Sequence, residues 1–344
     1  MSTYPFERLV NSNIAFEHVA LSYFRPDSPL PLVVRPAVKD LDLVGWAAAN
    51  RDAIERYLLR NGAILFRNFR ISGLEHFERL IAAACDPLLT ESYLSIPRQL
   101  SRGRVHSSTE YPAHQSIALH SESSAARNWP MKLFFFVQRI GEKGGETPIA
   151  DTRRIYEALS PEIRECFVRK GLMYVRNFGS GFDLPWQEVF QTSSKAVVED
   201  SCRKSQMEFE WIGEDQFRTR QRCNAVERHP RTGENVWFNQ AHLFHVSRLP
   251  AEVREWLMAA FGEHNLPRNV YFADGTRIEP AMLDEIMRVC EQQSIVYAWN
   301  EGDVLLLDNM LTAHGRKPFL GDRKVVVRIA EPHQTMAELS HAVR

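Results

Sequence analysis

The chain contains many short segments that are rich in β-branched and aromatic residues and are bounded by glycine, proline, asparagine or aspartate. Segments of this kind are typical of β-strands. The segments predicted to form strands are Ser116–Ser121, Lys132–Gln138, Met173–Phe178, Asn235–Phe238, Ser294–Ala298, Val304–Leu307 and Lys324–Ile329. The number and shortness of these strands restrict the chain to architectures in which sheets pack against each other or close on themselves.

Helical patterns lie between and around the strands. The predicted helices are Arg51–Arg60, a helix from a Ser72/Glu75 capping box to about Cys85, a helix from Ser160-Pro161 to Gly171, and a helix from Pro250 to Gly262. This pattern favours a mainly β fold with flanking helices, namely a double-stranded β-helix or jelly roll. We expect a single domain over residues 1–344, with a helix-rich part at 1–100 and the jelly-roll core at 101–332. The polar and irregular residues 180–233 are predicted to be an insertion over an active-site mouth.

Charge and composition exclude several classes of partner. The 42 basic and 43 acidic residues nearly cancel, so no electrostatic surface for nucleic acid or an anionic membrane is expected. No segment approaches the roughly 20 apolar residues that a membrane span needs, and no leader pattern is found. The five cysteines are odd in number and never form C-x-x-C, which indicates neither a disulfide framework nor a structural zinc site. A cytoplasmic location is therefore expected.

A histidine and an acidic residue separated by one position occur twice in the chain. His76 and Glu78 lie inside a predicted helix, where positions i and i+2 are about 200° apart around the axis and the side chains diverge. His120 and Glu122 lie on a predicted strand, where alternate residues share a face and can bind one metal ion. His120-Ser121-Glu122 is therefore the predicted metal-binding segment.

His314 is the predicted third ligand. It follows the apolar strand Val304–Leu307 and directly precedes Gly315, which places an imidazole at the rim of a barrel. Two histidines and one carboxylate form a facial triad that leaves half of an octahedral coordination sphere open for a 2-oxoacid and O₂. A closed tetrahedral site would leave no such space.

Other histidines provide weaker candidates. His242 and His245 are spaced i, i+3, but no E-x-x-H pattern accompanies them, so packing or substrate contact is the preferred interpretation. His106 and His114 have no spacing that supports a metal site, and structural roles are expected for them.

Six stretches of the sequence, in order, match one enzyme superfamily over about residues 50–332. The stretches are Asn61–Phe69, Val105–Pro112, His120–Glu122, Gly144–Asp151, Val236–His242 and Asp308–Arg316. On these residues the chain resembles the taurine and clavaminate dioxygenase-like superfamily of Fe(II)/2-oxoglutarate oxygenases. Within it, the chain is most similar to amino-acid hydroxylases of the syringomycin-pathway type, which act in secondary-metabolite and antibiotic biosynthesis.

The resemblance implies roles for particular residues. It implies that His120, Glu122 and His314 bind Fe(II), and that the Thr147 hydroxyl hydrogen-bonds 2-oxoglutarate. An arginine after His314 is implied to bind the distal carboxylate of 2-oxoglutarate, because a guanidinium binds a carboxylate bidentately. Arg323 is the first choice, Arg328 is the second, and both point inward only if a bulge intervenes. Arg316 is interpreted as structural.

The same resemblance implies the reaction and the substrate class. Fe(II), 2-oxoglutarate and O₂ together remove hydrogen from an sp³ carbon of the substrate while 2-oxoglutarate is decarboxylated to succinate. The implied substrate is an amino acid, free or tethered to a carrier protein. The residues expected near the substrate pocket are Trp237, Phe238, Asn239 and Gln240.

Three alternatives to hydroxylation remain open. Desaturation or ring closure would use the same ligands, and analogy of fold cannot separate them. A cupin-like metalloenzyme without 2-oxoglutarate usually carries an additional histidine two residues after its first ligand, where this chain has Glu122. A non-catalytic binding protein on the same scaffold should have lost a ligand, and His120, Glu122 and His314 are all present.

Overall fold

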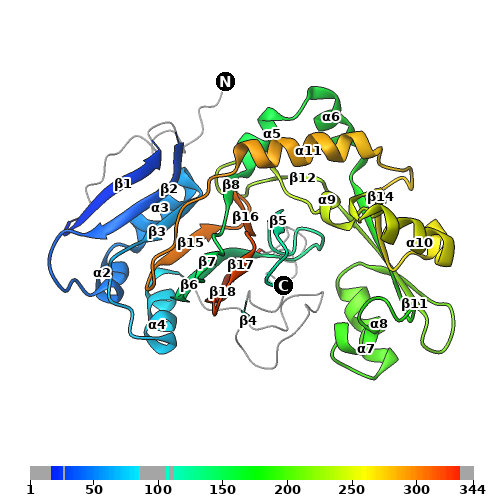
Figure 1. The fold of residues 1–344 in the computed structure, drawn as a ribbon, viewed down its shortest axis with the longest axis horizontal. Coiled ribbons are helices and arrows are strands. Elements are labelled where there is room, and N and C mark those ends of the chain that lie inside the picture. The colour runs from blue at the N-terminus through cyan, green and yellow to red at the C-terminus, as the bar shows by residue number, and fades with distance from the viewer. Residues whose placement is uncertain (1–16, 26–27, 86–105, 108–111, 334–344) are drawn as a thin grey trace, which may run out of the picture.

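The computed structural model describes residues 17–25, 28–85, 106–107 and 112–333. Within these residues the chain forms a mixed fold of helices and sheets (Figure 1). The largest sheet has seven strands in the order β1-β2-β3-β15-β6-β18-β4. These strands are β1 (Val19–Arg25), β2 (Ser28–Pro36), β3 (Ala63–Phe66), β15 (Val304–Asp308), β6 (Pro130–Arg139), β18 (Lys324–Pro332) and β4 (His106–Ser107). Strands β2 and β3 pair in parallel, and the other neighbours pair antiparallel.

A second, three-stranded sheet lies against the large one. Its strands, in order, are β5 (Ile117–His120), β16 (Thr312–Arg316) and β8 (Ile149–Asp151). Ile149 of β8 belongs to the same buried cluster as Phe135 and Leu305 of the large sheet, so the two sheets share one hydrophobic layer. Strand β17 (Phe319–Leu320), which follows β16 along the chain, forms a short pair with β7 (Lys143–Gly144).

The remaining strands lie in the right half of Figure 1. A four-stranded sheet has the order β10 (Glu208–Trp211), β11 (Phe217–Cys223), β9 (Leu172–Phe178) and β14 (Arg268–Phe272). Strands β12 (Val226–Arg228) and β13 (Asn235–Trp237) form a separate pair. The helices associated with this half are α7 (Trp186–Val189), α8 (Lys195–Lys204), α9 (Ala241–Phe244), η2 (Val246–Arg248), α10 (Ala251–Phe261) and η3 (Glu263–Asn265).

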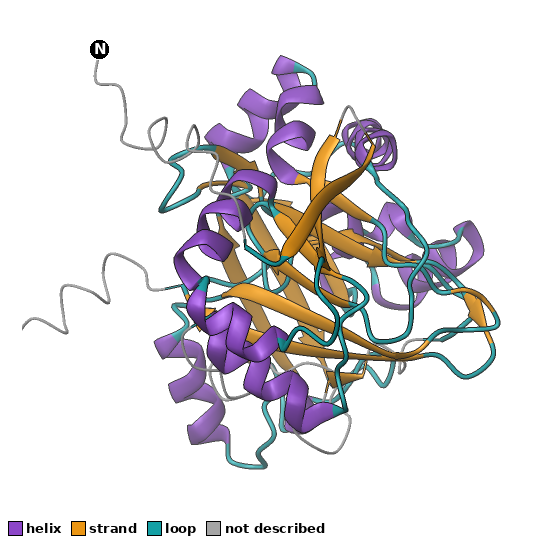
Figure 2. Cartoon of the chain, turned by 90° about the vertical axis from the view of Figure 1, so that its left-hand side faces the viewer, coloured by secondary structure: helices purple, strands orange, loops and turns teal. Residues whose placement is uncertain are grey.

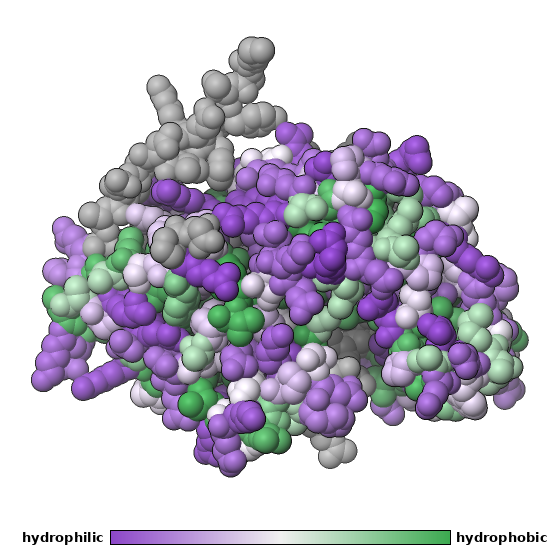
Figure 3. Space-filling view, turned by 45° about the horizontal axis from the view of Figure 1, so that its top comes forward, coloured by the Kyte–Doolittle hydropathy of each residue, from purple (hydrophilic) through white to green (hydrophobic). Residues whose placement is uncertain are grey.

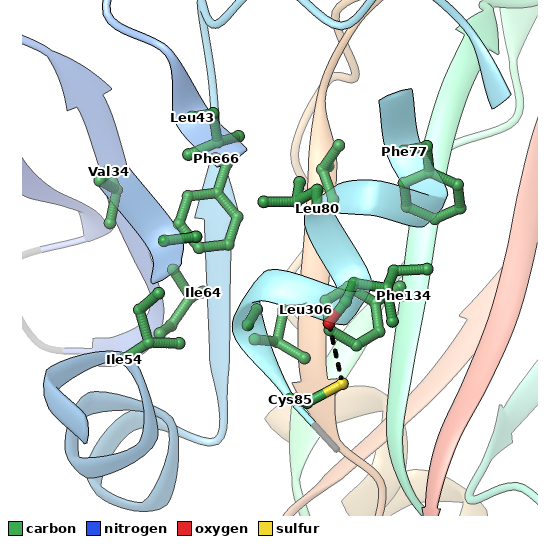
Figure 4. Packing of buried hydrophobic residues seen from close by; sticks show 14 of the residues in the cluster. Val34, Leu43, Ile54, Ile64, Phe66, Phe77, Leu80, Cys85, Phe134 and Leu306 are labelled. Atoms are coloured by element: carbon green, nitrogen blue, oxygen red, sulfur yellow. Dashed lines mark hydrogen bonds between the residues drawn. The ribbon is translucent and has the colours of Figure 1, made fainter. Parts of the chain in front are cut away.

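Helices cover the outer face of the seven-stranded sheet. They are α2 (Leu43–Ala49), α3 (Arg51–Asn61) and α4 (Leu74–Ala84), and Figure 2 shows helices packed against the strands on this side. Phe77 of α4 stacks on Phe136 of β6 with ring centroids 5.2 Å apart. Phe66 of β3 belongs to the same buried cluster, part of which Figure 4 shows. A fully buried phenylalanine contributes about 1.5–3 kcal/mol relative to an exposed one, so this layer anchors the sheet that carries the site.

Side chains that alternate along the strands of the large sheet contribute to two different hydrophobic cores, one on each face of the sheet. In β18, Val326 and Ala330 pack toward the helices, whereas Val325, Val327 and Ile329 pack toward the three-stranded sheet. A further cluster lies beneath α5 (Thr152–Ala158), α6 (Pro161–Lys170) and α11 (Pro280–Gln293), which run along the top of Figure 1. It includes Leu119 of β5 and Ala313 of β16, so these helices support the back of the strands that carry the two histidines.

Most of the predicted elements are confirmed. Strands occur at six of the seven predicted positions, and helices α3, α6 and α10 match within one or two residues. The prediction at Ser294–Ala298 is wrong, because only Ile295 forms an isolated bridge there, with Ile149. The capping box is also wrong in detail: α4 has Gly73 as its N-cap, and the Ser72 hydroxyl instead lies 3.2 Å from Nδ1 of His76.

One regional expectation is extended and another needs correction. Within the described residues of 1–100, the three helices are accompanied by β1, β2 and β3, which belong to the large sheet. The region 180–233 is not irregular, because it contains α7, α8, β10, β11 and β12. Phe217 in β11 packs there with Trp186 and Val198, which gives the region a hydrophobic cluster of its own.

The exterior is mostly hydrophilic on the side shown in Figure 3, with hydrophobic residues in scattered groups. None of the helices in the described part of the chain is both long and apolar enough to span a membrane.

Candidate metal centre

Three side chains from two neighbouring strands and a turn converge on one point. One ligand atom of each of His120, Glu122 and His314 lies within 4.8 Å of the others. His120 ends β5 and pairs directly with His314 of the adjacent strand β16, so their rings lie side by side with centroids 4.5 Å apart. The structure thus brings together the three residues that the sequence predicted as a metal site.

The His120 ring is oriented by the backbone of its own strand. Its Nδ1 lies 2.9 Å from the carbonyl oxygen of Ala118, which can only accept a hydrogen bond. Nδ1 therefore carries the proton, and the lone pair of Nε2 is left for a metal ion. A ligating histidine is commonly fixed in this way by a hydrogen bond to its other nitrogen.

His314 is the more buried of the two histidines, with 7% of its surface exposed. Its ring meets the edge of Phe135 from the large sheet, with centroids 5.1 Å apart. This contact joins the two sheets at the site, and it restricts the ring through packing.

Glu122 departs from the predicted geometry. The sequence predicts that it shares a strand with His120, but β5 ends at His120 and Glu122 is the first residue of a turn. Ser123, which follows it, has a positive φ of 59° and donates its backbone N–H to Oε1 of Glu122 over 3.1 Å. The carboxylate therefore reaches the histidines from the turn, and its position depends on what holds that turn.

Helix α9 and its N-cap hold the backbone on both sides of His120. Nε2 of His242 donates to the carbonyl oxygen of Leu119 over 2.8 Å, and Nε2 of Gln240 donates to that of Ser121 over 2.9 Å. Burial lowers the pKa of His242 to about 4, so its ring is neutral at neutral pH. His242 and His245, the weaker candidates for a metal site, therefore have other roles. His242 supports the backbone beside His120, and Nδ1 of His245 accepts a hydrogen bond from the N–H of Ser247 and so caps η2.

Thr147, Arg323 and Trp299 form a second buried group. The Thr147 hydroxyl accepts a hydrogen bond from Nε1 of Trp299 at 3.1 Å and one from Nη2 of Arg323 at 3.4 Å. Nε of Arg323 also donates to the carbonyl oxygen of Gly145 over 2.8 Å. Burial and the nearby Arg316 lower the pKa of Arg323 to about 10, so its guanidinium remains protonated at neutral pH. A buried cation beside a hydroxyl is suited to an anionic ligand.

Arg328 lies elsewhere. A register shift occurs between Lys324 and Val325, and such a bulge is what Arg323 and Arg328 would need to point inward together. Arg328 nevertheless follows the outer face of β18 and pairs with Glu78 of α4 at 2.7 Å. The structure therefore brings Arg323, and not Arg328, to Thr147.

The four residues predicted near the substrate have mostly packing roles. Trp237 lies against Phe167 with centroids 5.1 Å apart, and Phe238 lies against Trp129 at 4.9 Å. The Asn239 side chain donates to the carbonyl oxygen of Ala225 and accepts from the N–H of Ala241. Of the four, Gln240 is the one that contacts the metal-binding segment.

The other residues that the sequence analysis considered lie outside the candidate metal centre. Nη2 of Arg316 donates to the carbonyl oxygens of Pro112 and Gln115, in agreement with its structural interpretation. His76 lies beside Ser72, so it diverges from Glu78, which pairs with Arg328. His106 lies on β4, which pairs with β18, and His114 is exposed.

A separate hollow of about 700 Å³ lies beyond α9. Its lining is largely apolar and includes Phe182, Phe244 and Trp256, with Asp183 and Arg268 at its polar side. None of the three metal-binding candidates lines it. Phe244, which lines the hollow, contacts Tyr174, whose hydroxyl accepts from the backbone N–H of Gln240. Gln240 also donates to Ser121, so contacts connect the hollow to the metal-binding segment through α9 and its N-cap.

The donor set fits a ferrous ion. Two neutral imidazoles and one carboxylate form the facial set of non-haem iron oxygenases, and they leave positions open for other ligands. The hydrogen bond at Nδ1 of His120 leaves the nitrogen that a metal requires. The absence of cysteine from the set makes a closed structural zinc site a poor match.

Comparison with known proteins agrees with this chemistry. The sequence profile described as "Taurine catabolism dioxygenase TauD, TfdA family" matches residues 26–330. The dapdiamide synthesis protein DdaC of Enterobacter agglomerans is 41% identical over 292 residues, which cover 85% of this chain and 89% of that protein. A clavaminate synthase-like protein of Arabidopsis thaliana is 27% identical over 322 residues, covering 88% and 94%.

Solved structures share the fold. PvcB of Pseudomonas aeruginosa has a TM-score of 0.56 at 14% identity, with 93% of each chain covered. A second structure of PvcB, described as an Fe, alpha-ketoglutarate dependent oxygenase, has a TM-score of 0.55. The profile match decides among the alternatives left open by the sequence, against a cupin-like metalloenzyme and a non-catalytic binding protein. The chain belongs to the TauD, TfdA family, and it is an Fe(II)- and 2-oxoglutarate-dependent dioxygenase.

Proposed function

We propose that this enzyme hydroxylates an sp³ carbon of an amino acid, free or tethered to a carrier protein, in a secondary-metabolite pathway. The observation that carries the proposal is the convergence of His120, Glu122 and His314, whose ligand atoms lie within 4.8 Å of one another. In this proposal the three residues bind Fe(II). The retained carboxylate of Glu122 argues against halogenation, in which related oxygenases lose this ligand so that chloride can bind.

We further propose that the two facing sheets form a jelly roll. The seven-stranded and three-stranded sheets share the hydrophobic layer that contains Phe135, Ile149 and Leu305, as expected for two packed sheets. His314 from one sheet touches Phe135 from the other, so the proposed iron site would lie where the sheets meet.

Thr147 and Arg323 are proposed to bind the distal carboxylate of 2-oxoglutarate. Their side chains are in contact, both are at least 97% buried, and Arg323 is a cation at neutral pH. A guanidinium and a hydroxyl together provide charge-assisted hydrogen bonds to one carboxylate. Trp299, which the sequence analysis did not single out, would orient the Thr147 hydroxyl through its indole N–H.

The iron, once bound with 2-oxoglutarate and O₂, supplies the oxidising power for attack on an unactivated C–H bond. The residues of the chain bind and orient. His120 presents Nε2 because its Nδ1–H is held by Ala118, and His314 is restricted by Phe135. No side chain is required to act as a strong base, and the protein contributes position and exclusion of water.

The substrate proposal is supported by the relatives. The 41% identical protein is named for dapdiamide synthesis, which is a biosynthetic role. PvcB, which shares the fold, is described as an oxygenase from an isonitrile synthetic pathway. A free amino acid or an aminoacyl carrier protein is therefore the proposed partner, and no nucleic acid or membrane partner is proposed. Desaturation or ring closure of the same substrates is the alternative outcome.

A cytoplasmic location belongs to the same proposal. Cys202 and Cys290 are buried and form no disulfide. Unpaired buried thiols are typical of proteins that function in a reducing compartment.

Two experiments test the proposal. Anaerobic addition of Fe(II) and 2-oxoglutarate to the apo-protein should produce a weak visible charge-transfer band, and His120→Ala should abolish it. The absence of a band from the wild-type protein would contradict the iron site. Mass spectrometry of candidate amino acids and aminoacyl carrier proteins should then show a gain of one oxygen, whereas a loss of two hydrogens would indicate desaturation or ring closure.

A further inference from the structure

Glu122 lies outside the hydrogen-bond ladder that fixes the two histidines. The pairing of β5 with β16 joins His120 to His314 and Ile117 to Arg316, and β5 stops at His120. Glu122 begins the turn that follows, next to Ser123 with its left-handed backbone. A peptide group past the end of a strand needs other partners for its N–H and its carbonyl oxygen, especially when it is partly buried.

A single side chain supplies both partners. Oδ1 of Asn309 accepts the backbone N–H of Glu122 at 2.7 Å, and Nδ2 of Asn309 donates to the carbonyl oxygen of Glu122 at 2.9 Å. The same Nδ2 donates to the carbonyl oxygen of Pro130 at 2.9 Å, and Asn309 has 0% of its surface exposed. A carboxamide carries a donor and an acceptor in one plane, so it pairs with a peptide group as a neighbouring strand would.

The turn that carries Asn309 is itself anchored. Oδ1 of Asp308 accepts the backbone N–H groups of Met310 and Leu311, each at 2.9 Å. Oδ2 of Asp308 lies 3.1 Å from Nε2 of His229, whose Nδ1 accepts the N–H of Thr232 at 3.1 Å. Because Nδ1 is an acceptor, Nε2 carries the proton and donates to Asp308. Asp308 and His229 are at least 98% buried.

The anchored turn also leads directly into β16, which starts at Thr312 and carries His314. Residues 308–311 therefore connect both sides of the metal centre. They hold Glu122 through Asn309, and they set where β16 begins.

We infer that Asn309 is a positioning residue that holds the Glu122 carboxylate in register with His120 and His314, anchored by the hydrogen bond between His229 and Asp308. The inference rests on the proposed assignment of those three side chains as metal ligands. Asn309 touches the backbone of Glu122 and acts on the metal only through it. Groups that orient ligands in this way typically contribute about 10-fold to 100-fold in metal affinity.

The test measures the dissociation constant for Mn(II), used as a redox-stable probe, from the EPR signal of the free ion. Asn309→Ala should raise the dissociation constant about 10-fold to 100-fold. Asn309→Asp has the same size but loses both donated hydrogen bonds, so it should weaken binding as well and provides a second variant if Asn309→Ala folds poorly. Thermal unfolding of each apo-protein is recorded in parallel.

Asn177→Ala is the matched control. Asn177 is also a buried asparagine with a side chain that bonds to backbone, through Nδ2 to the carbonyl oxygen of Leu266, but it lies on β9 outside the metal centre. This variant should lower the unfolding temperature and leave the Mn(II) dissociation constant unchanged. If Asn309→Ala and Asn309→Asp behave like the control, the positioning role is refuted and Asn309 is merely structural.

A double-mutant cycle separates the inference from the metal assignment. Glu122→Ala alone should raise the Mn(II) dissociation constant by more than Asn309→Ala does. Adding Asn309→Ala to Glu122→Ala should cause little further loss, because the carboxylate that Asn309 positions is gone. Full additivity would contradict the inference. If Glu122→Ala itself has no effect, the ligand assignment fails instead.

Discussion

His120 and His314 are direct cross-strand partners, and their rings lie side by side with centroids 4.5 Å apart. Substitution of His314 by alanine should weaken Fe(II) binding more than about 100-fold, because even partners outside the ligand set contribute 10-fold to 100-fold. Anaerobic titration with Fe(II) at fixed 2-oxoglutarate, followed by the visible band, measures the loss. His245→Ala is the control and should titrate like the wild type, since His245 caps η2. Equal titration curves for both variants would contradict the assignment of His314.

Arg323 and Arg328 should have separable effects on 2-oxoglutarate use. Arg323→Ala should raise the KM for 2-oxoglutarate about 30-fold to 150-fold, as expected from the loss of about 2–3 kcal/mol in charge-assisted hydrogen bonding. Arg328→Ala breaks the ion pair with Glu78 and should leave this KM unchanged. Steady-state oxygen consumption at varied 2-oxoglutarate gives both values. A raised KM in Arg328→Ala alone would reverse the two assignments.

The buried ion pair between Arg67 and Asp303 should be important for stability. The two groups lie 2.6 Å apart with side chains 10% and 1% exposed, and they join the end of β3 to the start of β15. Asp303→Asn should lower the free energy of unfolding by about 3–5 kcal/mol, because it leaves a buried guanidinium without its counter-ion. Urea denaturation measures the change. Asp40→Asn removes the exposed pair with Arg70 and should cost less than about 1 kcal/mol. Similar losses in the free energy of unfolding for the two variants would show that the buried pair is no more important for stability than the exposed one.

Asp183 should make stability depend on acid pH. Burial alone would raise its pKa, but the hydrogen bond from Arg268 and the positive charge of Arg176 hold the pKa below its usual value. A lowered carboxyl pKa stabilises the folded state above the unfolded-state value of about 3.9, and this stabilisation is lost as the pH falls through the lower folded-state value.

Asp183→Asn should therefore lower the free energy of unfolding by about 1–3 kcal/mol at pH 7, and the difference from wild type should shrink below about pH 4. Urea denaturation at a series of pH values between 7 and 3 measures it. A difference that is constant across this range would show that the charge of Asp183 is not responsible.

The sequence predicted which three side chains converge at the candidate metal centre, because two signals agreed. The spacing of His120 and Glu122 gave one signal, and the order of the matching stretches gave the other. The details of Glu122 could not be read from the same pattern. Glu122 was expected to share a strand with His120, whereas Asn309, far away in the chain, provides the hydrogen bonds that a neighbouring strand would make.

Other differences also arise from contacts that are distant in sequence. In β11, Thr219 and Gln221 face inward beside Phe217, so a buried strand carries a polar pattern and residues 180–233 were predicted to be irregular. The choice between Arg323 and Arg328 could not be made from alternation, because Arg323 precedes the strand and a register shift follows it. The roles of Trp299 and His242 depend on hydrogen bonds to Thr147 and Leu119 that local sequence does not indicate.

Strand β5 has four residues and stops at the first ligand. A carboxylate carried past the end of its strand escapes the strict alternation that fixes whether a side chain points into a barrel or out of it. The position of the Glu122 carboxylate can therefore be altered by Glu122→Asp, or by substitutions within its turn, without changing the strands that carry His120 and His314. Directed evolution of metal preference in this scaffold is best aimed at residues 121–124, which lie between β5 and β6 and outside the paired strands.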